Sequence, residues 1–341
     1  MVTENNLYTE AGWINAAAIL QDPAYFIFVN GGRGIGKTYS VIKELIENGL
    51  PFLFLRRTEI EAAMQADIDN SSLQPVLEDM GILDGDHELT VRKTAKGKLA
   101  KIFVDGSEIC GCAALSTFAS LRGVNMSMYK VLLYDEFITE AHVRALKDEG
   151  AAFSNCYETI NRNRELKGQP PLKAILLANS LNIANDIYMH YDLIRPAEEL
   201  TRTGREIYRD GLKLLIVAQQ SPISKKKMDT ALYKAAADSY IRMSIQNKFI
   251  YNDFTYVKKQ NIQEYKALCR VGDLYIYKHK SSNRYYVTFT RASVTKEYNT
   301  GSADLERFRR EKCRYYSRYL DGFVMFDTYQ ALALFEKYYN K

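Results

Sequence analysis

The sequence predicts an α/β fold with a parallel sheet, followed by a smaller, basic α+β region. Three observations support this prediction. An aromatic and β-branched run at 25–29 leads into a glycine-rich loop at 31–36, and a helical pattern follows the loop. A second apolar run, at 52–55, follows that helix, so strand, helix and strand alternate as a parallel sheet requires. In the last hundred residues, short β-like runs and a basic helix replace this alternation.

The glycine-rich loop matches a phosphate-binding pattern. Residues 31–38 read Gly-Gly-Arg-Gly-Ile-Gly-Lys-Thr, the Gly-x-x-x-x-Gly-Lys-Thr form of a P-loop. In such a loop, backbone N–H groups surround a triphosphate, a lysine reaches the β- and γ-phosphates, and a hydroxyl binds Mg²⁺. Lys37 and Thr38 take these last two roles here, and Gly49 is predicted to cap the helix that follows. The residues predicted to surround ATP are Gly31, Gly32, Arg33, Gly34, Ile35, Gly36, Lys37, Thr38 and Tyr39.

A pair of acids follows another buried-strand pattern. Residues 130–134 read Lys-Val-Leu-Leu-Tyr and lead directly into Asp135 and Glu136. Because open α/β sheets bind ligands at the carboxyl ends of their strands, Asp135 is predicted to hold Mg²⁺ through water, together with Thr38. Glu136 is predicted to orient and activate the attacking water, a feature that separates hydrolysing ATPases from kinases. A surface pair of acids that merely ends a strand is the alternative.

Asn179 ends the buried-strand pattern at 171–178. It would lie beside Asp135 if the two strands are neighbours, and its carboxamide could then hydrogen-bond the γ-phosphate or the attacking water. Capping the next helix is the alternative role for this asparagine.

Several arginines are candidates for contacts with the nucleotide. A ring ATPase inserts a cation from the neighbouring subunit to neutralise charge in the transition state. Arg162 is the first candidate for that role and Arg122 the second, with surface arginines that are solvated or paired as the alternative. The pair Arg56-Arg57 ends the strand at 52–55, and it either contacts the base or phosphates of the nucleotide or caps the edge of the sheet.

Composition limits the class of protein. Apolar residues make up 47% of the chain and charged residues 26%, and no apolar run reaches the length of a membrane span. The five cysteines show no zinc-binding spacing, so they are predicted to be reduced thiols of a cytoplasmic protein. Residues 241–341 contain 19 Lys and Arg against 10 Asp and Glu, a net charge of +9, whereas the rest of the chain carries −4. This basic third favours a polyanionic partner, with ordinary variation in surface charge as the alternative.

The chain is predicted to contain three parts. Residues 1–195 form an ATPase motor domain that begins with a helix at 11–20. Residues 196–240 form a linker subdomain with a short helical pair, and residues 241–341 form a basic C-terminal domain that binds nucleic acid. In this last domain, β-like runs at 249–257, 274–278 and 285–290 precede a helix at 303–320.

Two basic segments are candidates for contacts with DNA. The lysines at 225–227 could touch DNA phosphates or merely keep a helix end soluble. In the helix at 303–320, arginines interleave with tyrosines, which predicts inward-packed tyrosines and an exposed basic face. A nuclease would need clustered carboxylates, but Asp253, Asp273 and Asp304 show no such cluster, so no nuclease activity is predicted. The candidate DNA contacts are Lys225, Lys226, Lys227, Arg309, Arg310 and Arg314.

These motifs together resemble a known family. The loop at 31–38, with an arginine inside it, resembles the Walker A motif of viral DNA-packaging motors and terminase large subunits. The wider set resembles the encapsidation ATPases of small, short-tailed, protein-primed phages of the Salasvirus, or Picovirinae, type. That set comprises Phe-Leu-Phe-Leu-Arg-Arg at 52–57, Ile-Phe-Val-Asp-Gly at 102–106, Asp-Glu-Phe at 135–137, Arg-Asn-Arg-Glu at 162–165, Leu-Ala-Asn-Ser at 177–180 and Gly-Phe-Val-Met-Phe-Asp at 322–327.

The resemblance implies a P-loop NTPase of the ASCE type with a RecA-like parallel sheet, and an RNase H-like C-terminal domain without a nuclease site. It implies a homomeric ring, usually pentameric, at the portal vertex of a procapsid in the host cytoplasm, where ATP and Mg²⁺ drive double-stranded DNA inward. Arg162 matches the arginine that acts across subunits, Arg122 a second basic position near the subunit boundary, and Asn179 a sensor. Some members of the family also use a packaging RNA.

Other functions remain open at this point. The nearest is another P-loop motor, either a helicase or a terminase with an active nuclease. A GTPase would need Asn-Lys-x-Asp, and residues 247–250 lack the aspartate, whereas a kinase would not need a basic C-terminal domain. A nucleotide-gated scaffold without turnover is a further alternative.

Overall fold

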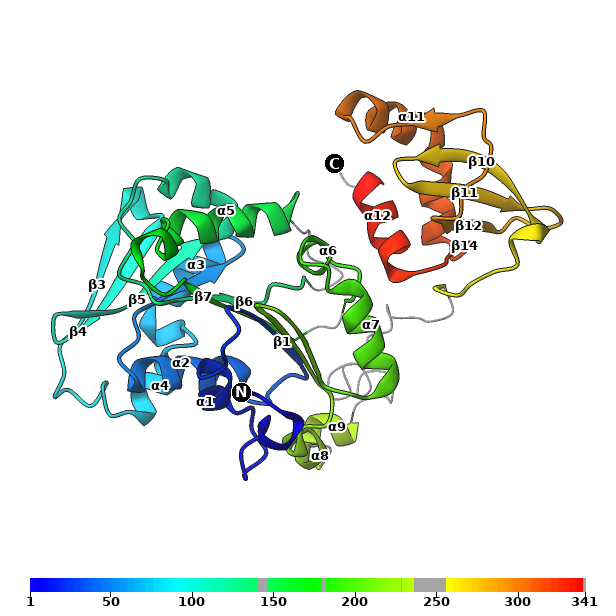
Figure 1. The fold of residues 1–341 in the computed structure, drawn as a ribbon. Coiled ribbons are helices and arrows are strands. Elements are labelled where there is room, and N and C mark those ends of the chain that lie inside the picture. The colour runs from blue at the N-terminus through cyan, green and yellow to red at the C-terminus, as the bar shows by residue number, and fades with distance from the viewer. Residues whose placement is uncertain (140–145, 180–181, 228, 236–255, 340–341) are drawn as a thin grey trace. The chain divides into compact units, whose positions relative to one another are not determined.

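The structure, a computed structural model, describes residues 1–139, 146–179, 182–227, 229–235 and 256–339 (Figure 1). Contacts divide the chain into two units. Met1–Leu181 and Glu199–Phe249 form the first, and Asn182–Glu198 and Ile250–Lys341 form the smaller second. The chain therefore passes from one unit to the other three times, and each unit is described by itself.

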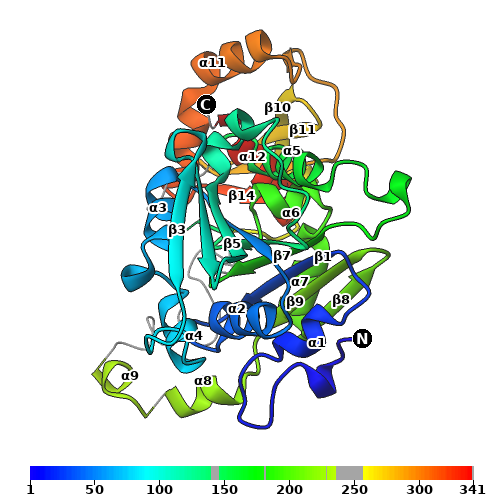
Figure 2. The ribbon, with the colours of Figure 1, turned by 90° about the vertical axis from the view of Figure 1, so that its left-hand side faces the viewer.

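The first unit is built on a nine-stranded sheet in the order β3-β4-β5-β2-β6-β7-β1-β9-β8. The strands from β5 to β9 in this order run parallel, and antiparallel strands lie at both edges (Figure 2). The predicted α/β class with a parallel sheet is confirmed. The strands are β1 (Phe26–Gly31), β2 (Phe52–Arg56), β3 (Leu89–Thr94), β4 (Leu99–Val104), β5 (Ser107–Ala114), β6 (Val131–Asp135), β7 (Lys173–Ala178), β8 (Ile207–Asp210) and β9 (Lys213–Ala218).

Helices cover both faces of this sheet. On one face, α2 buries Val41, Ile42 and Leu45 in a core that also contains side chains of α1, α4 and the central strands. On the other face lies α5 (Figure 1), and the ring of its Phe153 stacks on Tyr134 of β6. The helices of this unit are α1 (Ala16–Leu20), α2 (Lys37–Glu47), α3 (Glu59–Ala66), α4 (Gln74–Asp79), α5 (Glu149–Asn161), α8 (Pro222–Lys227) and α9 (Ala231–Ala235), and α7 (Ile194–Thr203) spans the boundary between the units.

The first helix is shorter than the sequence predicts. The apolar pattern predicts a helix at 11–20, but α1 begins at Ala16. Gly12 has a φ of +95°, which a right-handed helix excludes, and the Asn15 side chain caps α1 by accepting a hydrogen bond from the N–H of Ala18. The residues before α1 instead form a β-bridge between Tyr8 and Ile14.

The segment 196–240 also differs from its predicted description as a linker with a short helical pair. It contributes α8 and α9, but also β8 and β9, and β9 pairs in parallel with β1. The reason is the apolar run 214–217, whose four residues are completely buried in the sheet. This run and the Asp210-Gly211 turn before it are the signals that identify the hairpin.

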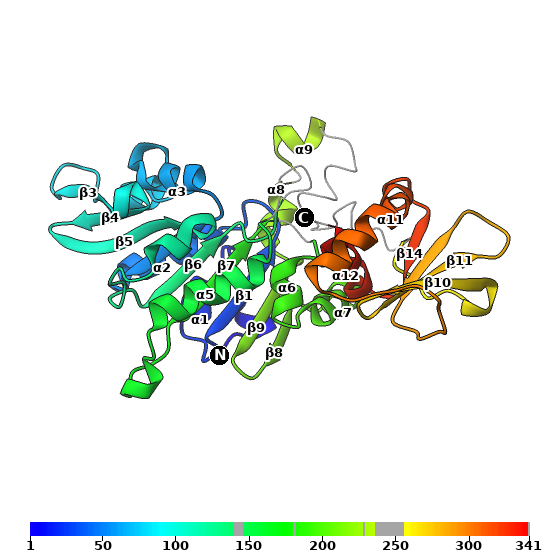
Figure 3. The ribbon, with the colours of Figure 1, turned by 90° about the horizontal axis from the view of Figure 1, so that it is seen from above.

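The second unit contains a five-stranded sheet in the order β13-β10-β11-β12-β14. The helices α11 and α12 contact each other and this sheet (Figure 3). The β-like runs at 274–278 and 285–290 and the helix at 303–320 are confirmed, whereas the run at 249–257 lies almost wholly outside the described residues. The elements are α6 (Asp186–His190), β10 (Tyr265–Val271), β11 (Leu274–His279), β12 (Tyr285–Thr288), β13 (Glu297–Tyr298), α11 (Ser302–Leu320), β14 (Val324–Phe326) and α12 (Tyr329–Tyr339).

Among the described helices, none combines the length and the apolar character needed to cross a lipid bilayer.

Candidate nucleotide-binding site

The P-loop lies between the end of β1 and the start of α2. Gly34 and Gly36 have φ values of +69° and +85°, in the left-handed region that favours glycine. A Cβ atom on Gly36 would also lie 3.2 Å from Cε3 of Trp13, so this position is tight as well as left-handed. The N–H of Ile14 donates to the carbonyl of Ile35 across 3.0 Å and ties the N-terminal segment to the loop.

Lys37, at the start of α2, is turned back into the loop. Its Nζ donates to the carbonyl oxygens of Gly31 and Gly32, each at 2.8 Å, and the side chain is almost completely buried. Burial lowers the pKa of Lys37 to about 7, although the charge of Asp135 opposes this shift. The lysine is therefore held where the motif requires it. The neighbouring Tyr39 instead points its hydroxyl at Asp79, with an O–O distance of 2.5 Å.

Thr38 and Asp135 meet at the carboxyl edge of the sheet. The strands that carry the P-loop and Asp135, β1 and β6, both pair with β7, so their ends lie one strand apart. The Thr38 hydroxyl is 3.2 and 3.3 Å from the two carboxylate oxygens of Asp135. A hydroxyl and a carboxylate are hard oxygen ligands, so this pair fits Mg²⁺.

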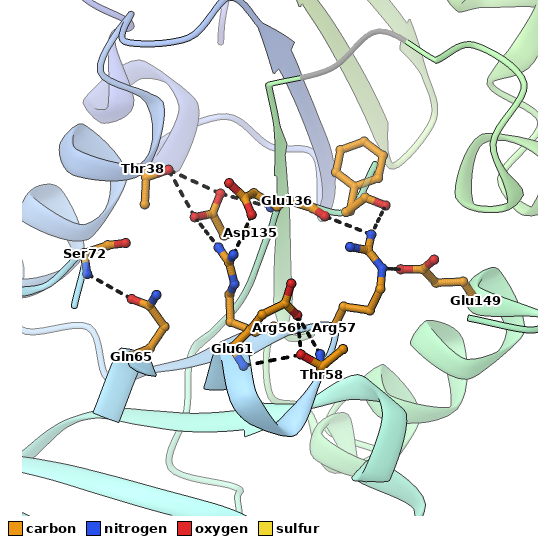
Figure 4. Close-up of polar contacts among 11 residues, drawn as sticks. Thr38, Arg56, Arg57, Thr58, Glu61, Gln65, Ser72, Asp135, Glu136 and Glu149 are labelled. Atoms are coloured by element: carbon orange, nitrogen blue, oxygen red, sulfur yellow. Dashed lines mark hydrogen bonds and ion pairs between the residues drawn. The ribbon is translucent and has the colours of Figure 1, made fainter. Parts of the chain in front are cut away.

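Arg56 joins the two acids at the end of β6 (Figure 4). Its Nη1 lies 3.1 Å from Oδ2 of Asp135, and its Nη2 lies 2.5 Å from Oε2 of Glu136. Asp135 is buried, whereas 47% of the Glu136 side chain is exposed. Burial raises the pKa of Asp135, and the positive charge of Arg56 lowers it. In this structure Arg56 therefore contacts the acids.

Arg57 holds the backbone beside these acids, a contact that the double arginine in the sequence does not by itself predict. Its Nη2 donates to the carbonyl oxygens of Glu136 and Phe137, at 2.9 and 3.0 Å. Its Nε lies 3.1 Å from Glu149, which also accepts a hydrogen bond from Tyr134. Glu136 has a φ of +58°, so these contacts support a strained backbone at the position of the predicted base. The signal in the sequence is the double arginine directly after a buried strand, which places a second guanidinium group at the carboxyl edge of the sheet.

Asn179 directly follows β7, the strand between β6 and β1. Asp135 pairs with Leu177, two residues before Asn179, so both residues lie at the same edge of the sheet. The next helix described, α6, is capped by the side chain of Asn185. The alternative role for Asn179, as the cap of the next helix, is therefore taken by another residue.

The structure does not bring Arg162 or Arg122 to the P-loop of their own chain. Arg162 follows α5, and the adjacent Asn161 accepts a hydrogen bond from the N–H of Leu172, just before β7 begins. Arg162 thus lies at the edge of the sheet opposite Asn179, with its Nη2 2.6 Å from the Val124 carbonyl oxygen. Arg122, two residues before Val124, is exposed.

The candidate DNA contacts fall into different environments. Lys226 is exposed, but Lys227 donates to the carbonyl oxygen of Arg33 in the P-loop across 2.7 Å. The side chain of Lys225 lies outside the described residues. In α11, Arg309 donates to the Tyr338 carbonyl oxygen, whereas Arg310 and Arg314 are exposed and Tyr315 is buried.

The three aspartates considered as candidate nuclease ligands have the following positions. Asp253 lies outside the described residues. Asp304 accepts a hydrogen bond from the N–H of Asn299 and pairs with Arg307, and Asp273 lies in the turn between β10 and β11. No group of three or more His, Cys, Asp or Glu side chains that could hold a metal ion occurs among the described residues.

Comparison with known proteins places this arrangement in context. The model of the family described as Podovirus DNA encapsidation protein (Gp16) matches residues 9–300. The DNA packaging proteins of Bacillus phage PZA and Bacillus phage phi29 are each 25% identical over 240 residues, 69% of this chain. The match spans 65% of the length of these two relatives.

A solved structure of the bacteriophage Phi-29 viral genome packaging motor assembly has a similar fold. It superposes with a TM-score of 0.64 at 19% sequence identity, and the match covers 96% of this chain and 99% of that chain.

Proposed function

Because the chain belongs to the podovirus DNA encapsidation protein family, we propose that it is an ATP-driven motor that moves double-stranded viral DNA into a procapsid. The observation that carries this proposal is the convergence of Lys37, Thr38 and Asp135 at one edge of the sheet, with Glu136 beside them. The DNA packaging proteins of phages PZA and phi29 are relatives over most of this chain, which supports the same substrate here.

The nucleotide would bind in the P-loop with its phosphates against the backbone N–H groups and Lys37. Thr38 and Asp135 would hold Mg²⁺, and a bound Mg²⁺ neutralises charge on the phosphates. The positive charge at the loop would attract the triphosphate. The buried Nζ of Lys37 donates to two carbonyl oxygens here, and it could exchange these hydrogen bonds for one to a phosphate oxygen. The class of reaction is hydrolysis of ATP to ADP and phosphate.

Glu136 would accept the proton of the attacking water. A carboxylate can do this only when a lone pair faces that water. Here Arg56 engages one of the two carboxylate oxygens, Oε2, so Glu136 could accept the proton at Oε1 with the pair intact, or at Oε2 once the pair loosens or rearranges. Asn179, at the same edge, would then hydrogen-bond the γ-phosphate or the water. Arg56 thus forms ion pairs with both acids, and a direct contact between Arg56 and the nucleotide stays a prediction.

The position of Arg162 favours action between subunits. The residue lies at the edge opposite its own P-loop, which supports a contact with the nucleotide of a neighbouring copy rather than with its own. The motor would therefore be a homomeric ring, which we propose to contain five subunits. Arg122 would lie near the boundary between adjacent subunits. The ring would act at the portal vertex of a procapsid in the host cytoplasm, with a packaging RNA as a further partner.

The second unit would contact DNA through the exposed face of α11. Arg310 and Arg314 lie on that face, whereas Tyr315 packs inward. Exposed arginines of this kind can bind the phosphate backbone without reading the base sequence. We expect this unit to have an RNase H-like fold without nuclease activity. A terminase-type motor with an active nuclease, or another P-loop helicase or translocase, is the alternative function.

The decisive experiment is to measure phosphate release against protein concentration, with and without duplex DNA. A DNA-stimulated rate that rises more steeply than the protein concentration supports a ring motor. A rate of hydrolysis per subunit that depends neither on DNA nor on protein concentration would contradict the proposed ring motor. Strand separation would instead indicate a helicase, and DNA cleavage lost in Asp273→Ala would indicate a nuclease.

A further inference from the structure

Lys227, at the end of α8, reaches into the P-loop of its own chain. Its Nζ lies 2.7 Å from the carbonyl oxygen of Arg33. A Cβ atom built on Gly34 would lie only 2.1 Å from the same Nζ, so the ammonium group packs directly against the backbone of the loop. The sequence analysis grouped this lysine with Lys225 and Lys226 as a candidate DNA contact, and the geometry gives it a different neighbour.

The base of α8 is anchored in the same part of the first unit. Ser221, just before α8, is buried and its hydroxyl donates to the carbonyl oxygen of Gly12 across 3.1 Å. Ile223 and Ser224 are buried as well. The Gly12 segment is itself tied to the P-loop through Ile14. The approach of Lys227 to the loop therefore rests on several packed residues as well as on its own flexible side chain.

The charges at the loop make this position suited to an anion. The ammonium groups of Lys37 and Lys227 both donate to carbonyl oxygens of the same loop, Lys37 to those of Gly31 and Gly32 and Lys227 to that of Arg33. Burial lowers the pKa of Lys227. Two ammonium groups on one loop repel each other, and phosphate groups between them would relieve that repulsion.

We propose that Lys227 is a second phosphate-binding lysine of this site, which acts on the nucleotide held by the P-loop of the same subunit. An ammonium group has three donors, so Lys227 can keep its hydrogen bond to Arg33 and offer another to a phosphate oxygen. The proposal rests on the proposed ATP binding. It also links the nucleotide to the segment after β9, because Lys227 ends α8 and its contacts would differ between an empty and an occupied loop.

The test compares Lys227→Ala, Lys227→Gln and Lys227→Arg with the matched control Lys226→Gln on the adjacent exposed lysine. Titration calorimetry measures the affinity of each protein for MgATP, MgADP and AMP, and fluorescence anisotropy measures binding to duplex DNA. Loss of one charge-assisted hydrogen bond predicts MgATP binding about tenfold weaker or more in Lys227→Ala and Lys227→Gln. We expect a smaller loss for MgADP, none for AMP, and affinity close to wild type in Lys227→Arg and Lys226→Gln.

Glutamine separates this role from bracing of the loop, because its amide can still donate to the Arg33 carbonyl oxygen but carries no charge. Wild-type affinity for MgATP in Lys227→Gln would overturn the proposal, as would a loss that is equal for ATP and AMP. Unchanged MgATP affinity with weaker DNA binding would return Lys227 to the DNA surface. If the wild-type protein binds no MgATP, the proposed function itself fails, an outcome distinct from these. Thermal unfolding checks that each variant is folded.

Discussion

Arg56 and Glu136 form an ion pair at the carboxyl edge of the sheet, with 2.5 Å between Nη2 and Oε2. The same guanidinium group contacts Asp135, so one arginine of β2 engages both acids at the end of β6. The residue that would activate water is thus held by a cation of its own subunit. Release of Oε2 from this contact would open a second carboxylate oxygen to the attacking water, which would make the pair a point at which the proposed hydrolysis could be controlled.

Replacing Arg56 by glutamine should raise the rate of ATP hydrolysis without DNA. Because nearly half of the Glu136 side chain is exposed, the ion pair is expected to contribute about 0.5–1 kcal/mol, which corresponds to a rise of about two- to fivefold. The measurement is phosphate release at saturating Mg²⁺ and ATP. The double variant Arg56→Gln, Glu136→Gln is the control and should show no rise. An unchanged or lower rate in the single variant would show that the pair does not restrain Glu136.

Lys37→Ala should weaken MgATP binding by about 100-fold, because it removes the cation that the loop directs at the phosphates. Lys43→Ala is the matched control. Lys43 is partly exposed on the same helix, where it pairs with Glu47 across 3.3 Å. Titration calorimetry measures the affinity of both variants for MgATP. Equal affinities in the two variants would refute the P-loop function of residues 31–38.

Glu136→Gln should bind MgATP with nearly wild-type affinity but hydrolyse it about 10²–10⁴-fold more slowly, since the amide cannot accept the proton of the attacking water. Binding is measured by calorimetry and turnover by phosphate release in the same preparation. Hydrolysis at the wild-type rate would remove Glu136 from the mechanism.

Arg162→Ala should fold and bind ATP, yet mixed rings should lose more activity than dilution alone explains. The physical reason is that Arg162 lies at the edge away from its own P-loop, so each mutant subunit would disable a neighbour. The measurement is ATPase activity against the fraction of mutant protein. A loss strictly proportional to that fraction would argue against action across the boundary.

Arg164→Ala supplies the contrast for that experiment. Arg164 is buried and donates to the carbonyl oxygens of Ser127 and Tyr129, at 2.8 and 2.6 Å. Its loss leaves the carbonyl oxygen of the buried Tyr129 without that donor, so this variant should unfold at a lower temperature than wild type.

Asp22→Asn should destabilise the protein by about 2 kcal/mol at pH 7. Asp22 is buried and both of its oxygens accept from Arg209, at 2.6 and 2.7 Å. Burial alone would raise the pKa of Asp22, but Arg209 and two backbone N–H groups lower it to about 2. A carboxyl with a lowered pKa stabilises the fold fully above its unfolded pKa of 3.8, and this contribution declines as the pH falls toward 2. Urea unfolding at pH 7 and pH 3 should therefore show a smaller difference between the two proteins at pH 3.

The sequence predicts the elements that carry local signals. The strand β1, the helix α2 and the strand β2 follow from apolar runs around the glycine-rich loop, and Asp135 follows from the run before it. The helix α1 is overpredicted because its apolar spacing hides the left-handed Gly12. The strand β9 is missed because its apolar run is flanked by polar segments that resemble a linker.

Contacts between distant residues lie beyond the sequence. Arg56 reaches Glu136 because β2 and β6 pair side by side, with Leu55 opposite Tyr134, and no local pattern fixes that register. Lys227 reaches Arg33 for a similar reason, since β9 pairs with β1 and thereby brings the start of α8 near the loop. Charge alone suggested DNA for this lysine.

The route of the chain between the units limits how the protein can be dissected. Residues 182–198 belong with the C-terminal unit, where α6 contacts α12 and Asp186 pairs with Lys337 across 3.3 Å. A protein cut after residue 249 would keep this stretch but lose its contacts with α12, including the ion pair between Asp186 and Lys337. An isolated first unit therefore calls for a short bridge in place of 182–198, rather than a stop codon alone.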